Sequence, residues 1–261
     1  MSNIVIKSEA DLAEMRKACK LAARTLVEAA KLIAPGVTTD EINRFVHDYT
    51  IKHNATPAPL GYRGYPKSVC TSVNEVICHG IPGDQKLKEG DIINVDVTSI
   101  LNGWHGDVSA TFYVGEVSDE ARRLVEVTRE CLKKGIEKVK PKTRLGDIGA
   151  VIQQYAESNG FSVVQDFVGH GIGRNFHEGP QVLHFGKAGR GQRLVQGMTF
   201  TIEPMINQGD YRSVILDDDW TAVTIDGKLS AQFEHTIAVT HDGVEIMTAF
   251  DEPLLNSEVF K

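Results

Sequence analysis

The sequence predicts an α+β fold made of two related halves, at about residues 8–117 and 118–250. Three observations predict it. Each half has the same order of patterns, two amphipathic helices followed by strands in which polar and apolar residues alternate. The strongest strand pattern, at 92–114, contains the hairpin-turn dipeptide Asn102-Gly103. No linker or low-complexity segment separates the halves, so we expect the 261 residues to form one domain.

Helix signals open the first half. Ser8 and Asp11 form a capping box, and the helix that follows is expected to run to Pro35-Gly36. Thr38 and Glu41 cap a second helix in the same way. A loop rich in proline and glycine follows, and residues 72–82 are predicted to form a strand that runs into a turn.

The second half repeats this order. One helix is expected from 118 to about 139, and Asp147 is expected to cap another that ends at Gly160. Strands are predicted at 198–206, 220–224 and 231–240. The spacing also repeats, because a glycine precedes Asp96 and Glu203 by six residues in each case. The repeat predicts two halves related by a pseudo-twofold axis, with the acids of each facing the middle.

Composition excludes several classes of protein. The net charge of −7 argues against a general nucleic-acid binder, and no apolar run is long enough to span a membrane. The N-terminus lacks the apolar segment of a signal peptide, which predicts a cytoplasmic protein. The four cysteines form no CxxC pair and are expected to be free thiols. No heptad or exposed repeat suggests association, so a monomer is expected.

The hairpin at 92–114 places two acids on one face. With the turn at Asn102-Gly103, Leu101 pairs with Trp104 and Asp96 pairs with Ser109. Asp107 then lies diagonally across from Asp96, at roughly 7 Å between Cβ atoms. A polar face on a hairpin is most simply explained by exposure to water. That explanation weakens because the rest of the chain supplies partners for both aspartates.

Glu203 and Glu234 also lie in predicted strands whose opposite faces are apolar. Acids are depleted from strands, so four at related positions suggest a cluster. Four buried carboxylates cannot all stay ionised without cations, and two divalent metals would balance their charge. His170, in the glycine-rich run VGHGIG, completes a donor set that suits Mn, Fe(II), Co or Zn.

Six further histidines differ in their sequence context. His177 and His79 lie near the candidate ligands in sequence, in FHEGP and CHGIP. Four others are expected to be structural: His47, His53, His184 and His241. HEGPQ is not the HExxH zinc motif, and GxGxxG, Walker and GxSxG motifs are absent.

Five collinear motifs carry a resemblance over nearly the whole chain: GYPKSVCTSVNEVICHGIP, INVDVTSILNGWHGD, GHGIGRNFHEGPQV, GMTFTIEPM and AQFEHTIAV. Together they resemble the type I methionine aminopeptidases of the bacterial cytosolic kind. The resemblance implies the pita-bread (creatinase/aminopeptidase) fold, with a curved antiparallel sheet between the two halves. It also implies removal of the initiator methionine from nascent proteins and peptides, with preference for a small second residue.

The resemblance implies metal and catalytic roles. Two metals would be bound by Asp96, Asp107, His170, Glu203 and Glu234, and the attacking water would be activated between them. Glu203 would also transfer the proton of that water. His177 would stabilise the oxyanion, and His79 would contact the scissile amide.

The resemblance implies a methionine pocket formed by Tyr62, Tyr65, Cys70, Phe176 and Trp220, with His79 and His177 also contacting substrate. A monovalent cation is expected near Asn94, Val97 and Ser230. Pro59 departs from relatives that carry cysteine there, which concerns the pocket rim. The partners would be the N-termini of nascent chains; ribosome contact stays open, and neither a specific nucleic acid nor a membrane is expected.

Two alternatives stay open. A proline dipeptidase or aminopeptidase P shares the implied fold but usually carries an extra N-terminal domain, for which the position of Asp96 leaves no room. A pita-bread protein that only binds partners typically loses metal ligands, whereas all five are present here. Both are therefore less favoured than the aminopeptidase.

Overall fold

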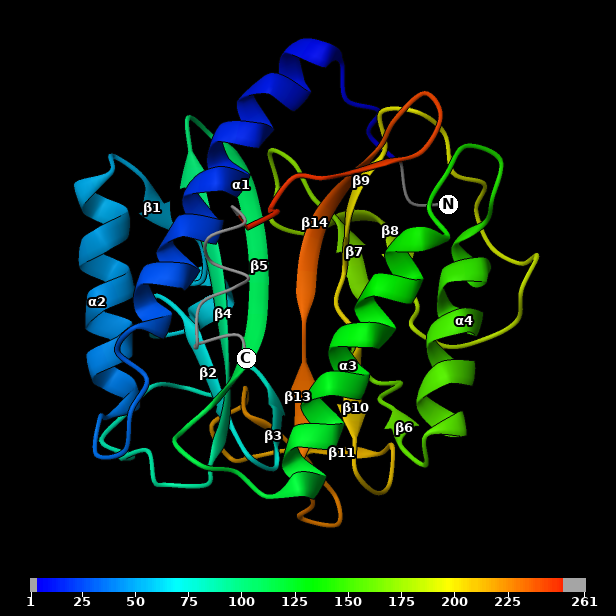
Figure 1. The fold of residues 1–261 in the computed structure, drawn as a ribbon. Coiled ribbons are helices and arrows are strands. Elements are labelled where there is room, and N and C mark those ends of the chain that lie inside the picture. The colour runs from blue at the N-terminus through cyan, green and yellow to red at the C-terminus, as the bar shows by residue number, and fades with distance from the viewer. Residues whose placement is uncertain (1–3, 251–261) are drawn as a thin grey trace.

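Four helices cover one face of a curved sheet in the computed structural model, which describes residues 4–250 (Figure 1). Within those residues the main sheet has nine strands, with the order β1-β4-β5-β14-β9-β7-β8 and with β2 and β15 paired to β4 and β14. All of its strand pairs are antiparallel, as predicted. The α+β fold is therefore confirmed.

Three helices begin at the predicted caps. They are α1 (Glu9–Ala30), α2 (Thr39–Lys52) and α3 (Asp119–Glu137), capped by Ser8, Thr38 and Ser118. The prediction that α1 runs to Pro35-Gly36 was wrong. The helix ends at Ala30, because tight turns formed by the N–H groups of Leu32 and Ile33 replace its last α-helical bonds.

The start predicted for α4 (Leu145–Ser158) was also wrong. Asp147 is the third residue of this helix and not the residue before it. Its carboxylate accepts the N–H of Arg144 at 2.8 Å, which satisfies a free donor at the helix start. The carboxylate therefore caps the helix from inside its first turn.

The central hairpin has the predicted register. In β4 (Ile92–Leu101) and β5 (Trp104–Tyr113), Leu101 pairs with Trp104 and Asp96 with Ser109. Asn102 and Gly103 have φ angles of 52° and 76°, as a turn of type I′ requires. The two aspartates therefore lie on the face that the sequence pattern predicts.

Strands predicted as continuous elsewhere are interrupted. The segment 72–82 contains two strands, β2 (Cys70–Val73) and β3 (Val76–Cys78), separated by a turn in which Asn74 has a φ of 54°. The strand at 198–206 splits into β9 (Thr199–Ile202) and β10 (Met205–Asn207). The strand at 231–240 splits into β13 (Ser230–Gln232) and β14 (Glu234–Val239). The strand predicted at 220–224 begins two residues later, as β12.

The remaining elements are short. They are β1 (Thr56–Pro57), the 3₁₀ turn η1 (Tyr62–Gly64), β6 (Ser162–Val163), β7 (Gly169–Gly171), β8 (Glu178–Val182), β11 (Ser213–Ile215), β12 (Ala222–Thr224) and β15 (Val244–Ile246). Two small sheets flank the main one, β13-β10-β6 and β11-β12-β3.

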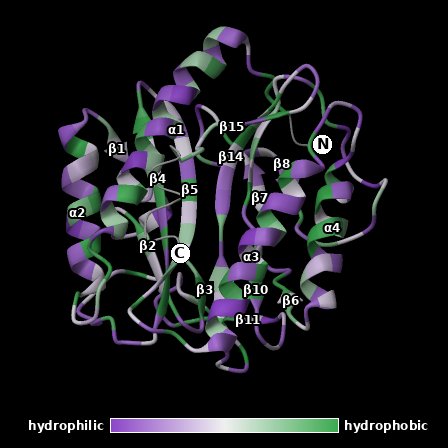
Figure 2. Cartoon of the chain, in the orientation of Figure 1, coloured by the Kyte–Doolittle hydropathy of each residue, from purple (hydrophilic) through white to green (hydrophobic). Residues whose placement is uncertain are grey.

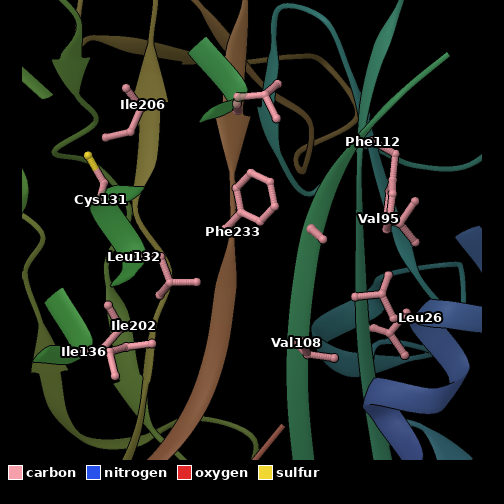
Figure 3. Packing of buried hydrophobic residues seen from close by; sticks show 14 of the residues in the cluster. Leu26, Val95, Val108, Phe112, Cys131, Leu132, Ile136, Ile202, Ile206 and Phe233 are labelled. Carbon is pink, nitrogen blue, oxygen red and sulfur yellow. The ribbon is translucent and has the colours of Figure 1, made fainter. Parts of the chain in front are cut away.

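The apolar core lies between the helices and the sheet. Figure 3 shows Phe233 between two groups of side chains, one from α3 and the strands beside it and one from β4 and β5. Leu26 of α1 packs into the same core. In Figure 2 the polar residues of α3 and α4 lie mainly on the outer surfaces of these helices. One face of the sheet is thus sealed by helices, and the opposite face is available for a site.

All four cysteines, Cys19, Cys70, Cys78 and Cys131, are free and buried, as expected. Among residues 4–250, no helix is both long and apolar enough to cross a membrane.

Candidate active site

The strand register brings the four acids together on the open face of the sheet. Asp96 pairs with Ser109 of β5, and Ser109 pairs with Glu234 of β14. Continuing the pairing of β14 with β9 by one residue places Glu203 opposite Glu234. Asp96, Glu234 and Glu203 therefore form one row across the sheet. Asp107 lies in the next row, beside Thr236, whose hydroxyl contacts both backbone groups of Asp107.

His170 approaches the acids from the neighbouring strand β7. Its Nε2 lies 3.7 Å from Asp107 Oδ2 and 3.6 Å from Glu203 Oε1. Ligand atoms of Asp107, His170 and Glu234 all lie within 4.8 Å of one another. These distances are suited to a shared cation, since several donors converge on one small volume.

Burial and mutual repulsion change the protonation of these groups. Burial raises the pKa of Asp107 to about 7 and the pKa of Glu203 to about 8. The pKa values of Asp96 and Glu234 lie well above normal because of burial and, next, the charge of Asp107. Burial lowers the pKa of His170 to about 4, so its imidazole is neutral at pH 7. A neutral imidazole has a lone pair available for a metal.

The donor set fits divalent cations. Within residues 4–250, two oxygens of the site are buried without a hydrogen-bond partner, Asp96 Oδ1 and Gln232 Oε1. An unpaired buried carboxylate oxygen is costly unless a proton or a cation compensates it. Four carboxylates and one imidazole, with no thiolate among them, match the preferences of Mn, Fe(II), Co and Zn.

Glu203 lies at a break in its strand and is held by three side chains. Thr201 Oγ1 donates to Glu203 Oε1 at 2.7 Å, and Gln232 Nε2 lies 3.3 Å from Glu203 Oε2. The N–H of Glu203 donates to Nε2 of His184 at 3.1 Å. His184, expected from the sequence to be structural, therefore contacts a candidate ligand, which was not predicted. No local pattern could have revealed it, because the contact depends on the strand break.

A cavity of about 380 Å³ opens above the acids. Every residue predicted for the site lines it: Tyr62, Tyr65, Cys70, His79, Asp96, Asp107, His170, Phe176, His177, Glu203, Trp220 and Glu234. Sequence reasoning missed other lining residues, among them Cys78, Phe167, Met205 and Gln232. Phe167 and Met205 adjoin glycine- or proline-containing turns, so their direction could not be predicted from alternation.

Aromatic rings form the walls of this cavity. Tyr62 lies 5.0 Å from Phe176 and 5.2 Å from His177, measured between ring centroids. Tyr65 packs edge-on against Trp220 at 5.1 Å, and its hydroxyl donates to Gly80 O at 2.9 Å. A buried aromatic wall of this kind accommodates a flexible apolar side chain.

Two neutral histidines flank the acids. Burial lowers the pKa of His177 to about 3 and also lowers the pKa of His79. The ring of His177 lies 4.1 Å from the ring of His170, and His79 lies edge-on to Phe167 at 5.4 Å. A neutral imidazole can donate one N–H to a carbonyl oxygen without bringing a charge into the cavity.

The other histidines differ in surroundings. His47 contacts Ser68 Oγ at 2.9 Å, His53 contacts Tyr49 O at 2.8 Å, and His241 is exposed. None of the three lines the cavity.

The residues predicted to bind a monovalent cation have separate partners. Asn94 Nδ2 donates to Gln232 O at 2.9 Å, Ser230 Oγ contacts Ile206 O at 3.4 Å, and Val97 packs in the core. The monovalent site stays a prediction.

The chain matches known proteins over most of its length. Residues 13–241 match the model of metallopeptidase family M24. The chain is 60% identical over 246 residues to methionine aminopeptidase A of Synechocystis sp., which covers 94% of this chain and 97% of that protein. The crystal structure of methionine aminopeptidase from Rickettsia prowazekii aligns with a TM-score of 0.94 at 53% identity, over 95% of this chain and 100% of that one.

A more distant structure shares only the fold. The prolidase from Pyrococcus horikoshii aligns with a TM-score of 0.76 at 22% identity, over 96% of this chain and 65% of its own. Together these matches show the pita-bread fold that the sequence predicted. The chain therefore belongs to metallopeptidase family M24, as a member of its methionine aminopeptidases.

Proposed function

We propose that this protein is a type I methionine aminopeptidase that removes the initiator methionine from nascent chains and peptides, with preference for a small second residue. One observation carries the proposal: four acids and His170 converge at the base of a cavity walled by aromatic rings. A cation site directly beside an apolar pocket suits an enzyme that cleaves next to an apolar side chain. Membership of family M24 supports the hydrolytic reaction.

Two divalent cations would be held by Asp96, Asp107, His170, Glu203 and Glu234. The charge count supports two, because four carboxylates at −4 are balanced by two ions at +2 each. When bound, such ions polarise the substrate carbonyl and lower the pKa of water. The raised pKa values of the acids mean that they release protons as cations bind.

The pocket would receive the methionine side chain. Tyr62, Tyr65, Cys70, Phe176 and Trp220 line its wall and offer a mostly apolar, polarisable surface. The free α-amino group would bind near the metals, where its neutral nitrogen offers a lone pair. The amide nitrogen of an N-acetylated peptide has no such lone pair available, so that peptide should fail to react.

The neutral histidines would act on the scissile bond. His177 would donate an N–H to the carbonyl oxygen as negative charge develops there, and His79 would contact the amide nitrogen. Glu203, ionised once cations are bound, would accept a proton from the attacking water and pass it to the leaving amine.

We also propose that the chain works as a monomeric cytoplasmic protein whose two halves form one catalytic domain. Its buried free thiols are compatible with a reducing compartment.

Release of free methionine from a Met-Gly peptide tests the proposal. The chelated protein is assayed with and without Co(II), Mn(II), Fe(II) or Zn(II), beside an N-acetylated peptide and an Xaa-Pro peptide. Metal-dependent release from the free Met peptide alone is expected. Cleavage of only the Xaa-Pro peptide would indicate a proline peptidase, and a folded protein inactive with every metal would indicate a binding protein.

A further inference from the structure

A buried ion pair joins the start of the chain to the turn that carries Phe176 and His177. Lys7 Nζ lies 2.6 Å from Glu178 Oε2, and the two side chains are only 2% and 6% exposed. Their positions are 171 residues apart in the sequence. A buried ion pair adds little net stability over apolar side chains of the same size. The ion pair is better explained by the position in which it holds the turn that carries Phe176 and His177.

Glu178 closes the turn with its other oxygen. Oε1 accepts the backbone N–H of Asn175 at 3.1 Å and lies 3.4 Å from Asn175 Nδ2. Phe176 and His177 lie between these two residues, and both line the cavity. Both carboxylate oxygens of Glu178 are therefore engaged, one by the turn and one by Lys7.

His177 depends on this turn for its position. Within residues 4–250 its imidazole makes no hydrogen bond, and it is held only by contacts with the rings of Tyr62, His170 and Phe176. Phe176 in turn stacks on His105, whose N–H donates to Gly173 O at 2.9 Å. Ring contacts alone permit sliding, so the backbone of the turn must set where the imidazole lies.

Lys7 is itself anchored from several sides. Its N–H donates to Gly197 O at 2.8 Å, just before β9, and Ile4 forms a parallel bridge with Gly179. A Cβ atom at Gly173 would lie 2.6 Å from Lys7 Cε, so the turn packs closely on this side chain. Figure 1 shows the dark-blue start of the chain beside the second half of the molecule before α1 crosses to cover β4 and β5.

We propose that Lys7 and Glu178 are positioning residues, whose ion pair holds the turn so that His177 faces the candidate metal ligands and Phe176 closes the pocket. The proposal rests on the proposed function and extends it to a segment that does not line the cavity. It predicts that residues 4–7 are needed for full turnover.

The test uses Lys7→Met and Glu178→Gln, each of which keeps side-chain size and removes a charge. Loss of geometry at a catalytic group is expected to lower kcat about 10- to 100-fold, with a smaller change in KM. Mn(II) affinity should stay unchanged, because no candidate ligand is altered. Lys7→Arg should recover most of the activity, since it restores the charge.

A second readout is independent of activity. The nine histidines are labelled in the ring for NMR, and the His177 signal is assigned with His177→Ala. Lys7→Met and Glu178→Gln should shift or broaden that signal. Arg16→Met is the matched control, because Arg16 forms an ion pair of 2.6 Å with Glu245, and neither residue belongs to the turn. It should leave kcat and the His177 signal unchanged.

The proposal is overturned if both variants are folded, keep kcat within twofold of wild type and leave the His177 signal in place. If a single variant does not fold, Lys7→Met/Glu178→Gln leaves no charge unpaired and is judged by the same criteria. A wild-type protein that releases no methionine would refute the proposed function alone, and the NMR arm would still decide the role of the ion pair.

Discussion

Asp96 and Glu203 are comparable residues in the two halves, and their backbones are held in different ways. Each lies six residues after a glycine with a φ near +90°, Gly90 and Gly197. Asp96 lies inside a continuous ladder, paired with Cys70 of β2 on one side and Ser109 of β5 on the other. Glu203 lies in the gap between β9 and β10, where Pro204 follows.

A strand break can hold a ligand when side chains replace the missing strand partner. Inside a ladder, neighbouring strands fix the backbone of Asp96. At the break, the N–H of Glu203 has no ladder partner and donates to His184. Two further side chains, Thr201 and Gln232, orient the carboxylate. The first half thus relies on backbone pairing, and the second half on surrounding side chains.

The largest effect is expected from removing one carboxylate charge in either half. Asp96→Asn and Glu203→Gln should each abolish metal-dependent methionine release, because both acids are proposed to hold the same pair of cations. The folded structure should persist, since a neutral amide relieves repulsion among buried carboxylates. Peptide assays and circular dichroism check this. Near-normal kcat in either variant would mean that the substituted acid is not needed to bind the catalytic metals. Asp242→Asn, which alters an exposed acid, is the control.

A smaller effect is expected at His177. Loss of its N–H in His177→Ala should lower kcat by about 100- to 1000-fold, as for other groups that stabilise an oxyanion. KM should change less, because the hydrogen bond strengthens as the charge develops. Steady-state kinetics at saturating metal measures both. A variant changed in KM alone would contradict the proposed role.

His184 tests the strand break directly. His184→Ala removes the acceptor of the buried Glu203 N–H and should destabilise the protein by about 1–3 kcal/mol. We expect metal affinity to fall by about 10- to 100-fold, as for other residues that orient a ligand. Denaturant unfolding and Mn(II) titration measure the two effects, with His241→Ala as an exposed control. Unchanged metal affinity would mean that Thr201 and Gln232 suffice to hold Glu203.

The smallest effect concerns pH in the metal-free protein. Asp107 and Glu203 have pKa values raised by burial to about 7 and 8, so they bind protons more tightly when folded. Their contribution to stability is present at low pH and is lost as the pH rises through these values. Burial lowers the pKa values of His170 and His184, and their contribution to stability is complete above pH 6.5.

Stability of the metal-free protein should therefore fall between pH 6.5 and 8.5, and Mn(II) should reverse the trend. Thermal unfolding at several pH values, with chelator or with metal, shows whether stability falls or rises as the pH increases. Asp107→Asn should flatten the decline, because it removes one of the titrating groups. A metal-free protein that gains stability over this range would contradict the raised pKa values.

The fold class, three of the four helix starts and the β4–β5 register could be predicted from the sequence alone. These features depend on local signals, namely capping boxes, alternation and the Asn102-Gly103 turn. The sequence also singled out the three histidines and four of the five acids that line the cavity, Asp166 being the exception. Acids in otherwise apolar strands are unusual, and the five motifs are collinear.

Tertiary structure decided the rest. The breaks at Glu203 and Phe233 lie within segments that alternate as continuous strands do, so only the surrounding strands and helices show where pairing stops. The contact of His184 with Glu203 and the ion pair of Lys7 with Glu178 join residues 19 and 171 positions apart. Periodicity reports only on neighbours along the chain, and such contacts exist only once distant segments have packed together.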